Sequence, residues 1–388
     1  MRTILVRIAA FVLVVVLGIS MSLLLTFVGD KSKGPVSDLI TTVNAGISHL
    51  EKRFTATRAH RVSDLKWLER YRHRTAGIAT ADRMLLGAYD DNTAESYESI
   101  VALEDSLDTR LPIMSIYSAW GSRPDQVFPL LRVQAIADLG SIPMVTWEPW
   151  LDDFSPDQFP FSAHAENKNK GGMRAIAEGR YDVYIDKWAL DAKAFGEPFF
   201  LRLGHEMNDP YRYPWGPQNN QPDDFIAAWQ HVVTRFRTLG ATNAIWVWSP
   251  HPAYKNFEAF YPGHAFVDWV GTTAINYGTV APWSQWWSFQ EVIGAFYERV
   301  SLYKKPVIIC EFGSLSVGGN RPAWFADALR TLPTRYPAIR AVVFYHNGND
   351  KTTTYKSLDW TFRTDSASVA AIKQAIRSGP GTRQPADI

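Results

Sequence analysis

Residues 199–206 of the chain read FFLRLGHE, an apolar run that ends in a histidine and a glutamate. A short, continuous apolar run is typical of a strand buried on both faces of a parallel sheet. Eight such runs occur along the chain: Met84–Tyr89, Pro112–Tyr117, Ile142–Trp147, Phe199–His205, Ala244–Trp248, Trp269–Asn276, Val307–Glu311 and Ala341–Tyr345. Eight strands that alternate with helices predict an α/β fold, a (β/α)8 TIM barrel over residues 81–378.

Helical patterns separate most of these runs. They are Glu95–Leu107, Pro124–Leu139, Tyr181–Phe195, Pro222–Leu239, Ser288–Tyr303, Arg321–Leu332 and Ser366–Arg377. A doubly wound open sheet is the alternative architecture. No Gly-x-Gly-x-x-Gly follows the first strand and no P-loop is present, which counts against the open sheet.

The N-terminal region predicts a membrane attachment. Ile8–Val28 is a 21-residue stretch without a charge, and at 1.5 Å per residue it would span about 30 Å, the thickness of a bilayer core. We predict an uncleaved transmembrane helix within residues 1–29. The alternative is a cleaved signal peptide, although the run is long and no Ala-x-Ala follows it. Residues 30–80 are predicted to form a helical basic stem, and residues 379–388 a flexible tail.

Composition excludes several classes of protein. Lys plus Arg number 40 and Asp plus Glu 39, so a basic surface built for nucleic acid is not expected. The single cysteine, Cys310, excludes an intramolecular disulfide and a cysteine-based zinc site. His205 to Asp209 is not a His-Glu-x-x-His motif, there is no Gly-x-Ser-x-Gly elbow, and the nine histidines lack metal-ligand spacing. No metal and no cofactor are predicted.

Two glutamates stand at the ends of predicted strands. Glu206 follows the fourth strand and Glu311 ends the seventh, and in a barrel these ends form the active site. A buried carboxylate is costly without a partner, so a structural ion pair with Arg202 is one interpretation. Paired carboxylates surrounded by aromatic rings are also the arrangement that glycoside hydrolysis requires. Glu148 ends the third strand as well.

Aromatic residues gather in the same region. Eleven of the fifteen tryptophans lie between Trp147 and Trp287. Trp188 and Trp229 lie in predicted helices and are assigned to the core. We expect at least three of the others to line a glycan cleft, with packing at the barrel rim as the alternative. These candidates are Trp147, Trp150, Trp215, Trp248, Trp283, Trp286 and Trp287.

The segment RLGHEMNDPYRYPW, residues 202–215, resembles the acid/base motif of glycoside hydrolase family 26. ATNAIWVWSP (241–250), VDWVG (267–271) and KPVIICEFGS (305–314) extend the resemblance. It implies a TIM barrel and a retaining endo-β-glycanase, with Glu206 as general acid/base and Glu311 as nucleophile. It also implies that His205 orients Glu206 or binds near the cleaved sugar, and that Tyr277 hydrogen-bonds the nucleophile. The residues predicted to bind substrate are His205, Asn208, Tyr211, Trp215, Tyr277, Trp147, Trp150, Trp248, Trp283 and Tyr345.

The chain departs from the family pattern beside the acid/base. The family commonly continues His-Glu-Met-Asn-Gly, whereas this chain has Asp209 and Pro210. A carboxylate at that position puts the subsite shape and the pKa of Glu206 in question. The expected partner is a polymeric β-glycan, a β-1,4-linked mannan or glucan that includes mixed-linkage glucan, met outside the cytoplasm by a membrane-anchored enzyme. A transglycosylase, or a non-hydrolytic glycan-binding accessory of a membrane polysaccharide synthase, remains as an alternative.

Overall fold

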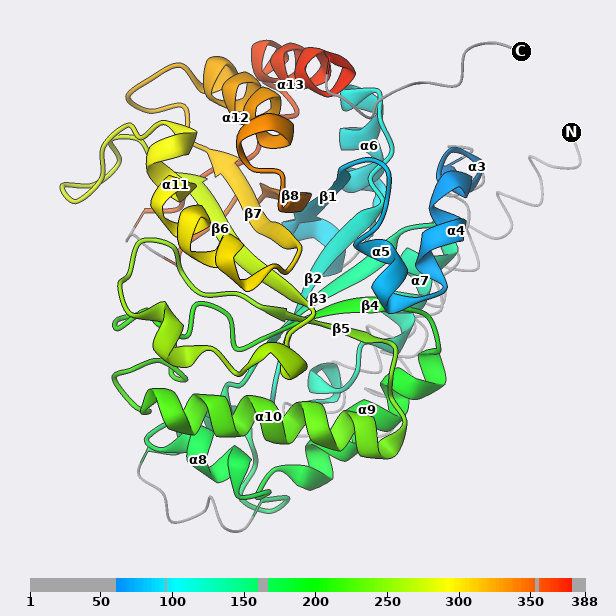
Figure 1. Cartoon of the computed structure of the whole chain (residues 1–388), viewed down its shortest axis with the longest axis vertical. Helices are drawn as coiled ribbons and strands as arrows, with labels where there is room; N and C mark the ends of the chain where they lie inside the picture. The colour runs from blue at the N-terminus through cyan, green and yellow to red at the C-terminus, as the bar shows by residue number, and fades with distance from the viewer. Residues whose placement is uncertain (1–60, 95, 160–166, 353–355, 379–388) are drawn as a thin grey trace, which may run out of the picture. The chain divides into compact units, whose positions relative to one another are not determined.

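The computed structural model describes residues 61–94, 96–159, 167–352 and 356–378. Within them, eight parallel strands form a closed barrel in sequence order, as predicted (Figure 1). The strands are β1 (Leu85–Asp90), β2 (Ile113–Ala119), β3 (Ile142–Glu148), β4 (Phe199–Leu203), β5 (Ala244–Trp248), β6 (Trp269–Asn276), β7 (Val307–Ser314) and β8 (Ile339–His346).

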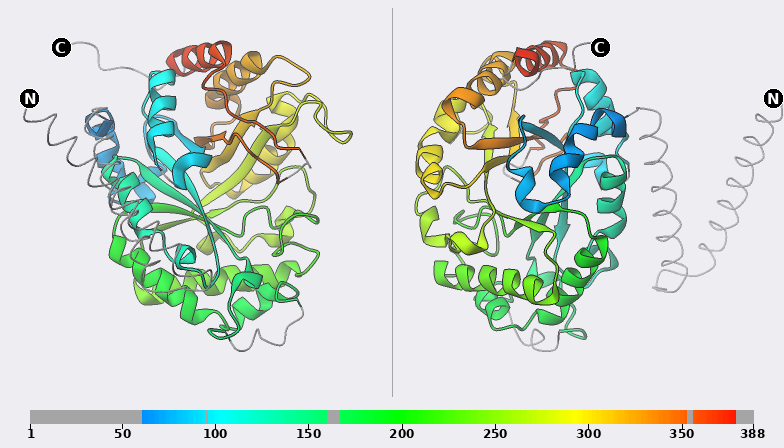
Figure 2. Two further views of the ribbon diagram at one scale, coloured as in Figure 1. Left: turned by 180° about the vertical axis from the view of Figure 1, so that it is seen from behind. Right: turned by 45° about the vertical axis from the view of Figure 1, so that its right-hand side comes forward.

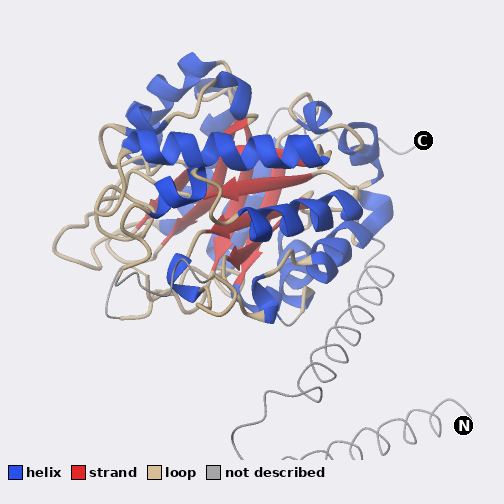
Figure 3. Ribbon diagram, turned by 90° about the horizontal axis from the view of Figure 1, so that it is seen from below, coloured by secondary structure: helices blue, strands red, loops and turns tan. Residues whose placement is uncertain are grey.

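Helices surround these strands (Figure 3). Those that follow β1 and its successors are α6 (Glu98–Leu107), α7 (Leu130–Asp138), α8 (Gly172–Ala177), α9 (Asp182–Phe195), α10 (Pro222–Leu239), α11 (Phe289–Val300), α12 (Arg321–Arg335) and α13 (Ser366–Ser378). α10 shows how the sequence sets helix bounds. Pro222 opens it, acids occupy its first turn, and Gly240 ends it with φ 77°.

The predicted helix 124–139 is two elements instead of one. Pro124–Gln126 forms a 3-10 turn and α7 begins only at Leu130. Pro129 explains the break, because the residue before a proline is pushed out of the helical region and an interior proline removes a hydrogen bond of the helix. The α12 helix, by contrast, is longer than predicted. It runs past Leu332 to Arg335 and carries Pro333 inside its last turns.

Strand alternation sorts the side chains into two layers. Ile245 and Val247 of β5 lie in the apolar cluster that fills the barrel, together with Phe200, Ile308 and others. Trp246 and Trp248 belong to the cluster between the sheet and the helices. Because successive strand residues point to opposite faces, one residue in two faces the barrel axis. That inward set reaches the site at the carboxyl ends of the strands.

Short helices close the opposite end of the barrel. α3 (Arg61–Asp64), α4 (Glu69–Arg72) and α5 (Thr75–Ile78) precede β1 (Figure 2, right). Leu68 and Ile78, both 0% exposed, join the cluster inside the barrel. The part of the predicted stem that the structure describes, 61–80, therefore packs on the barrel.

The predicted membrane helix, 1–29, and the predicted tail, 379–388, lie outside the described residues, as do residues 30–60 of the predicted stem. Within the part of the chain that the structure covers, no helix is both long and apolar enough to cross a membrane.

Candidate active site

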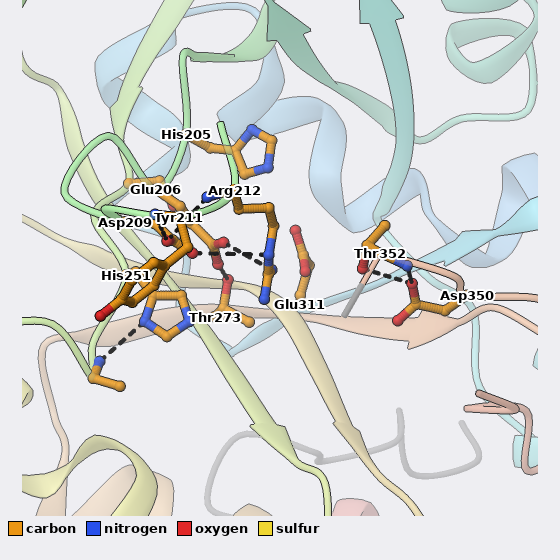
Figure 4. Close-up of polar contacts among 12 residues, drawn as sticks. His205, Glu206, Asp209, Tyr211, Arg212, His251, Thr273, Glu311, Asp350 and Thr352 are labelled. Atoms are coloured by element: carbon orange, nitrogen blue, oxygen red, sulfur yellow. Dashed lines mark hydrogen bonds and ion pairs between the residues drawn. The ribbon is translucent and has the colours of Figure 1, made fainter. Parts of the chain in front are cut away.

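Inward-facing side chains meet at the carboxyl ends of the strands. Tyr89 of β1 packs between Tyr117 of β2 and Tyr345 of β8, with ring centroids 4.9 and 5.5 Å away. Arg202 of β4 is fully buried beside them. The layer thus changes from apolar residues inside the barrel to tyrosines and charges at its mouth, where Glu206 and Glu311 lie (Figure 4).

A β-bulge directs Glu311 into this layer. The register between β6 and β7 shifts so that Thr272 faces Ile309 and Thr273 faces Glu311, which leaves Cys310 as the extra residue. Cys310 lies in the barrel cluster, whereas Phe312 lies among the helix-facing residues. Without the bulge, alternation would turn Glu311 toward the helices. Bulges that re-aim a side chain are common beside active sites.

Two groups hold the Glu311 carboxylate. Arg202 Nη1 donates to Glu311 Oε1 at 2.6 Å, and Tyr117 Oη donates to the same oxygen at 2.8 Å. Burial and the nearby Glu311 charge raise the pKa of Tyr117 well above its usual value of 10, so its hydroxyl keeps the proton it donates. Tyr117 is thus a donor to Glu311 that the sequence did not predict. The hydrogen bond from Tyr277 that the family resemblance implies stays a prediction.

Glu206 lies just beyond the end of β4 in a left-handed conformation. Its φ is 53°, uncommon for a residue with a side chain, and Gly204 before it has φ 49°. The backbone is fixed on both sides. Gly204 N donates to Trp147 O of β3, and Glu206 N donates to Ser249 O after β5 at 2.7 Å. Strained backbone of this kind is found where function needs a side chain placed against local preference.

The Glu206 side chain is almost fully buried and shares a network with Glu311. Thr273 Oγ1 donates to Glu206 Oε1 at 2.6 Å. Arg202 Nη2 donates to Thr273 Oγ1 at 3.4 Å while Nη1 binds Glu311. One buried arginine therefore contacts both the Glu311 carboxylate and the hydroxyl that binds Glu206. The ion pair with Arg202 that the sequence suggested exists, and it lies inside the two-carboxylate site.

Cations around Glu206 set its ionisation. Burial alone would raise the pKa of Glu206, but the opposite charges of His251, Arg212, His205 and Arg202 outweigh burial and lower that pKa to about 2. Arg212 Nη1 lies 3.4 Å from Glu206 Oε2. Arg202 and Arg212 are the permanent cations of this group, because a guanidinium stays charged at any working pH.

His205, the residue before Glu206, is buried and does not face solvent. It is 1% exposed, and its ring lies 4.5 Å from that of Tyr213 and 6.3 Å from that of Tyr117. Burial, together with the charge of Arg202, lowers the pKa of His205 well below 6.5. Its Nδ1 has no hydrogen-bond partner among the described residues. A neutral imidazole here can bind a ligand hydroxyl without adding charge beside Glu206.

Glu148 brings a third carboxyl group to the site. It ends β3, two residues after Thr146, and therefore faces the axis. Burial raises the pKa of Glu148 to about 7, against the lowering effects of Trp150 and Arg202. At neutral pH this carboxyl group is partly protonated and can both donate and accept hydrogen bonds.

Comparison with known proteins agrees with this arrangement. Residues 162–305 match the model of the family described as Glycosyl hydrolase family 26. Endoglucanase H of Acetivibrio thermocellus is 31% identical over 296 residues, which cover 74% of this chain and 30% of that protein. The chain belongs to glycosyl hydrolase family 26. The mannan endo-1,4-beta-mannosidase of Bacillus subtilis is 23% identical over 269 residues, which cover 64% of this chain and 65% of that protein.

Solved structures of the family share the fold. A GH26 beta-mannanase from Bacteroides ovatus superposes with a TM-score of 0.55 at 18% identity, over 84% of this chain and 94% of that one. The catalytic domain of a GH26 endo-beta-1,4-mannanase from a Bacillus species gives 0.56 at 14% identity, over 78% and 89%. At such identities the likeness concerns the barrel alone. The chain spans under a third of the length of Endoglucanase H, the first of its curated relatives.

Two tryptophans predicted to line the cleft of this family 26 barrel are core residues. Trp147 and Trp248 are both 0% exposed. Trp147 stacks on Trp188 of α9 with centroids 4.2 Å apart, and Trp248 packs on Tyr261 at 5.0 Å. The reason is strand parity, since both side chains alternate with residues that face the barrel interior and therefore point to the helices. The prediction for these two rings is corrected.

Trp215 is also buried, at 1% exposure, and supports the loop after β4. Its Nε1 donates to His205 O at 2.7 Å, and its ring stacks on Tyr213 with centroids 4.8 Å apart. Trp150 is half-buried against the edge of Trp215, 5.4 Å away. Trp215 therefore shapes the loop that carries Glu206 and offers no open face to a sugar.

Exposed rings do occur at the mouth. Tyr211 is 81% exposed, and Trp283 is 54% exposed with its ring 5.2 Å from Tyr277. These two keep the predicted role of sugar platforms. Asn208, by contrast, is engaged within the protein. Its Nδ2 donates to the carbonyls of His251 and Tyr254, and its Oδ1 accepts from His251 N, so it braces the loop after β5.

Sequence reasoning missed several side chains that build the site. Tyr117 and Thr273 each bind a glutamate, and Arg212 lies beside Glu206. A usable signal was available for the first two. The inward parity of a strand is fixed by its apolar residues, and counting forward from Ile113 and Trp269 in steps of two reaches Tyr117 and Thr273. No pattern in the sequence marks Arg212, which a loop positions.

Proposed function

We propose that the chain is a retaining endo-β-glycanase that cleaves a β-1,4-linked mannan or glucan, including mixed-linkage β-1,3-1,4-glucan. The observation that carries the proposal is the Arg202 network. It links two glutamates from β4 and β7 at the mouth of a family 26 barrel. Two carboxyl groups on opposite sides of a glycosidic bond are what hydrolysis by double displacement needs.

Glu311 suits the nucleophile in this scheme. A carboxylate oxygen attacks the anomeric carbon, the glycosidic bond breaks, and the leaving oxygen takes a proton from Glu206. In the second half, Glu206 removes a proton from water, the water oxygen attacks the anomeric carbon, and the bond to Glu311 breaks. Arg202 and Tyr117 keep the carboxylate of Glu311 oriented between these steps.

Relatives of different specificity support a β-glycan substrate and not one polymer. The chain is similar to proteins named Endoglucanase H, mannan endo-1,4-beta-mannosidase and beta-1,3-xylanase. The Endoglucanase H match has the highest identity of the three, which favours glucan as the first polymer to test. Tyr211 and Trp283 would supply the apolar faces on which pyranose rings stack.

The proposal places the barrel outside the cytoplasm, attached through the apolar stretch Ile8–Val28. Polymeric glycans are found there, and the stretch is long enough for a membrane span. A topology reporter fused to the C-terminus tests this placement, and a cytoplasmic signal would contradict it.

The activity is tested with a panel of soluble mannans, β-glucans and xylans, with products sized by chromatography. We expect internal cleavage, products with retained anomeric configuration, and no cleavage by the Glu311→Gln variant under conditions where that variant stays folded. Loss of a nucleophile lowers kcat by up to about 10⁶-fold in well-studied enzymes. Inverted products would exclude double displacement. Longer products made in the presence of acceptor sugar would indicate a transglycosylase.

A further inference from the structure

The loop after β4 folds back so that one arginine reaches two carboxylates. Asp209 Oδ1 accepts from Tyr211 N at 2.8 Å and from Arg212 N at 3.3 Å, which turns the chain. The Arg212 side chain then extends toward Glu206 (Figure 4). Its Nη1 lies 3.4 Å from Glu206 Oε2 and its Nε lies 3.7 Å from Asp209 Oδ2.

Neither of the two contacts of Arg212 with a carboxylate is a close, parallel pair. Both distances are longer than the 2.7–2.9 Å of a strong charge-assisted bond. Asp209 is 1% exposed, and its Oδ2 has no hydrogen-bond partner among the described residues. A buried carboxylate oxygen without a donor is costly. A short movement of the Arg212 guanidinium toward Asp209 would satisfy that oxygen, so a second position for the side chain is built into the loop.

Arg212 is the member of the trio that a ligand can reach. Its side chain is 22% exposed, against 2% for Glu206 and 1% for Asp209. A sugar ring that binds beside Glu206 would therefore meet the arginine first, and the two carboxylates would stay fixed beneath it.

The chemistry requires that the charge beside Glu206 change. A general acid must carry a proton at the working pH, whereas the pKa of Glu206 is about 2 with its cations in place. The groups that face it come from several elements: Arg202 from β4, His205, Asp209, Arg212 and Tyr213 from its own loop, His251 and Tyr254 after β5, Thr273 from β6 and Glu311 from β7. Arg202 is held by Ser249, Glu311 and Thr273. Arg212, which also bonds to Tyr213, has a second carboxylate, Asp209, within 3.7 Å.

We propose that Arg212 is a positioning residue that shares its charge between Glu206 and Asp209 and moves to Asp209 when a glycan binds beside Glu206. The movement leaves Glu206 free to take up the proton that it passes to the leaving oxygen. Asp209, the residue by which this chain departs from its family's usual glycine, is the acceptor that makes the movement possible. The inference rests on the proposed function for its purpose, but the electrostatic coupling can be measured without activity.

The direct test is a carbon-13 NMR titration of the Glu206 carboxyl group in the full chain, assigned by the signal that Glu206→Gln removes. Arg212→Gln should raise the midpoint by at least about one unit, because a neighbouring cation lowers a carboxyl pKa by about 1–3 units. Arg212→Lys, which keeps the charge, should restore most of the difference. Arg180→Gln removes the cation of an exposed pair with Glu178 and is the matched control. An unchanged midpoint in Arg212→Gln would overturn the inference.

The ligand-driven movement is tested in the Glu311→Gln background with cellotetraose and mannotetraose. Ligand should raise the Glu206 midpoint, and Asp209→Asn should abolish that rise because Arg212 then has no second carboxylate. An equal rise in Asp209→Asn would overturn the role of Asp209. Failure of either sugar to perturb any signal would count against the proposed substrate class, while the Arg212→Gln result still decides the coupling.

Kinetics give an independent readout. Raising the pKa of the acid moves the basic limb of kcat/KM to higher pH, so Arg212→Gln should shift that limb upward for polymer. Hydrolysis of an aryl glycoside whose leaving group needs no proton should keep its rate. Equal losses on both substrates would mean that Arg212 only supports the loop, and would overturn the inference.

Discussion

Two buried arginine–glutamate pairs lie at opposite ends of the same barrel. Arg61 and Glu104 are both 0% exposed, and Arg61 Nε reaches both oxygens of Glu104 at 2.9 and 2.8 Å. The other donors of Arg61 bind the carbonyls of Leu111 and Leu139 and the hydroxyl of Ser141. This pair ties the segment before β1 to α6 and to the start of β3.

The pair at the mouth of the barrel is built differently. Arg202 is also 0% exposed, but the Glu311 side chain keeps 13% exposure. The donors of Arg202 go to three side chains of other segments: Ser249 after β5, Thr273 of β6 and Glu311 of β7. Arg61, fully buried with Glu104, fixes segments of backbone relative to one another. Arg202 instead binds several side chains and so fixes the relative positions of the two glutamates at the mouth of the barrel.

The largest expected effect is on stability, and it distinguishes Arg61 from Arg202. Arg61→Met leaves the Glu104 carboxylate buried without its partner, and breaking a buried pair in this way costs about 3–5 kcal/mol. We expect a large loss of stability and, at temperatures where the variant is folded, nearly unchanged kcat. Arg202→Met should lose stability too, and its kcat should also fall by about 10²-fold, since Glu311 loses one of its two orienting donors. Denaturant unfolding and polymer kinetics measure both.

A matched repair sharpens this comparison. The Arg61→Met, Glu104→Leu double variant removes both charges of this buried pair. It should recover much of the lost stability, because well-packed apolar residues often replace a buried ion pair without loss. Restored stability with wild-type kcat would fit a structural role. A double variant that folds well but hydrolyses the polymer slowly would show that the Arg61–Glu104 pair also affects the site at the other end of the barrel.

The difference between the two ends also explains what the sequence could predict. Eight apolar runs were enough for the barrel and for Glu206 and Glu311 at its mouth, because strand ends meet there whatever the loops do. The prediction failed for Trp147 and Trp248 because a place near the end of a strand does not decide which face a side chain takes. Alternation along β3 and β5 turns both rings toward the helices.

The bulge at Cys310 and the fold-back of the loop at Asp209 could not be predicted. Both depend on register and turn geometry that emerge only when distant strands pair. They are also what brings Glu311 and Arg212 into the site. The part of the site that follows from periodicity was thus open to sequence reasoning, and the part that follows from an irregularity was not.

A moderate effect is expected at Thr273, the hydroxyl between the two glutamates. Thr273→Val keeps the shape but removes the donor to Glu206 Oε1. A hydrogen bond to a charged group contributes about 1.5–3 kcal/mol, so kcat/KM on polymer should fall by roughly 10- to 100-fold. The pKa of Glu206 should rise, because the ionised form loses a donor. Thr272→Val, one residue away and also buried, is the control, and equal losses in both would indicate a general packing defect.

The smallest effect is expected at Glu148, and it should depend on pH. Burial raises the pKa of this carboxyl group from 4.5 to about 7. A raised acid pKa means that the folded protein resists ionisation, so Glu148 lowers stability progressively as pH rises through 4.5 toward 7. Glu148→Gln should therefore match the wild type at pH 4 and be more stable at pH 8. The full shift would give roughly 3 kcal/mol, but the side chain is partly exposed, so solvent screening reduces the expected difference to about 1–2 kcal/mol. A stability difference that stays constant between pH 4 and 8 would show that Glu148 ionises normally, and would place its carboxyl group in contact with solvent.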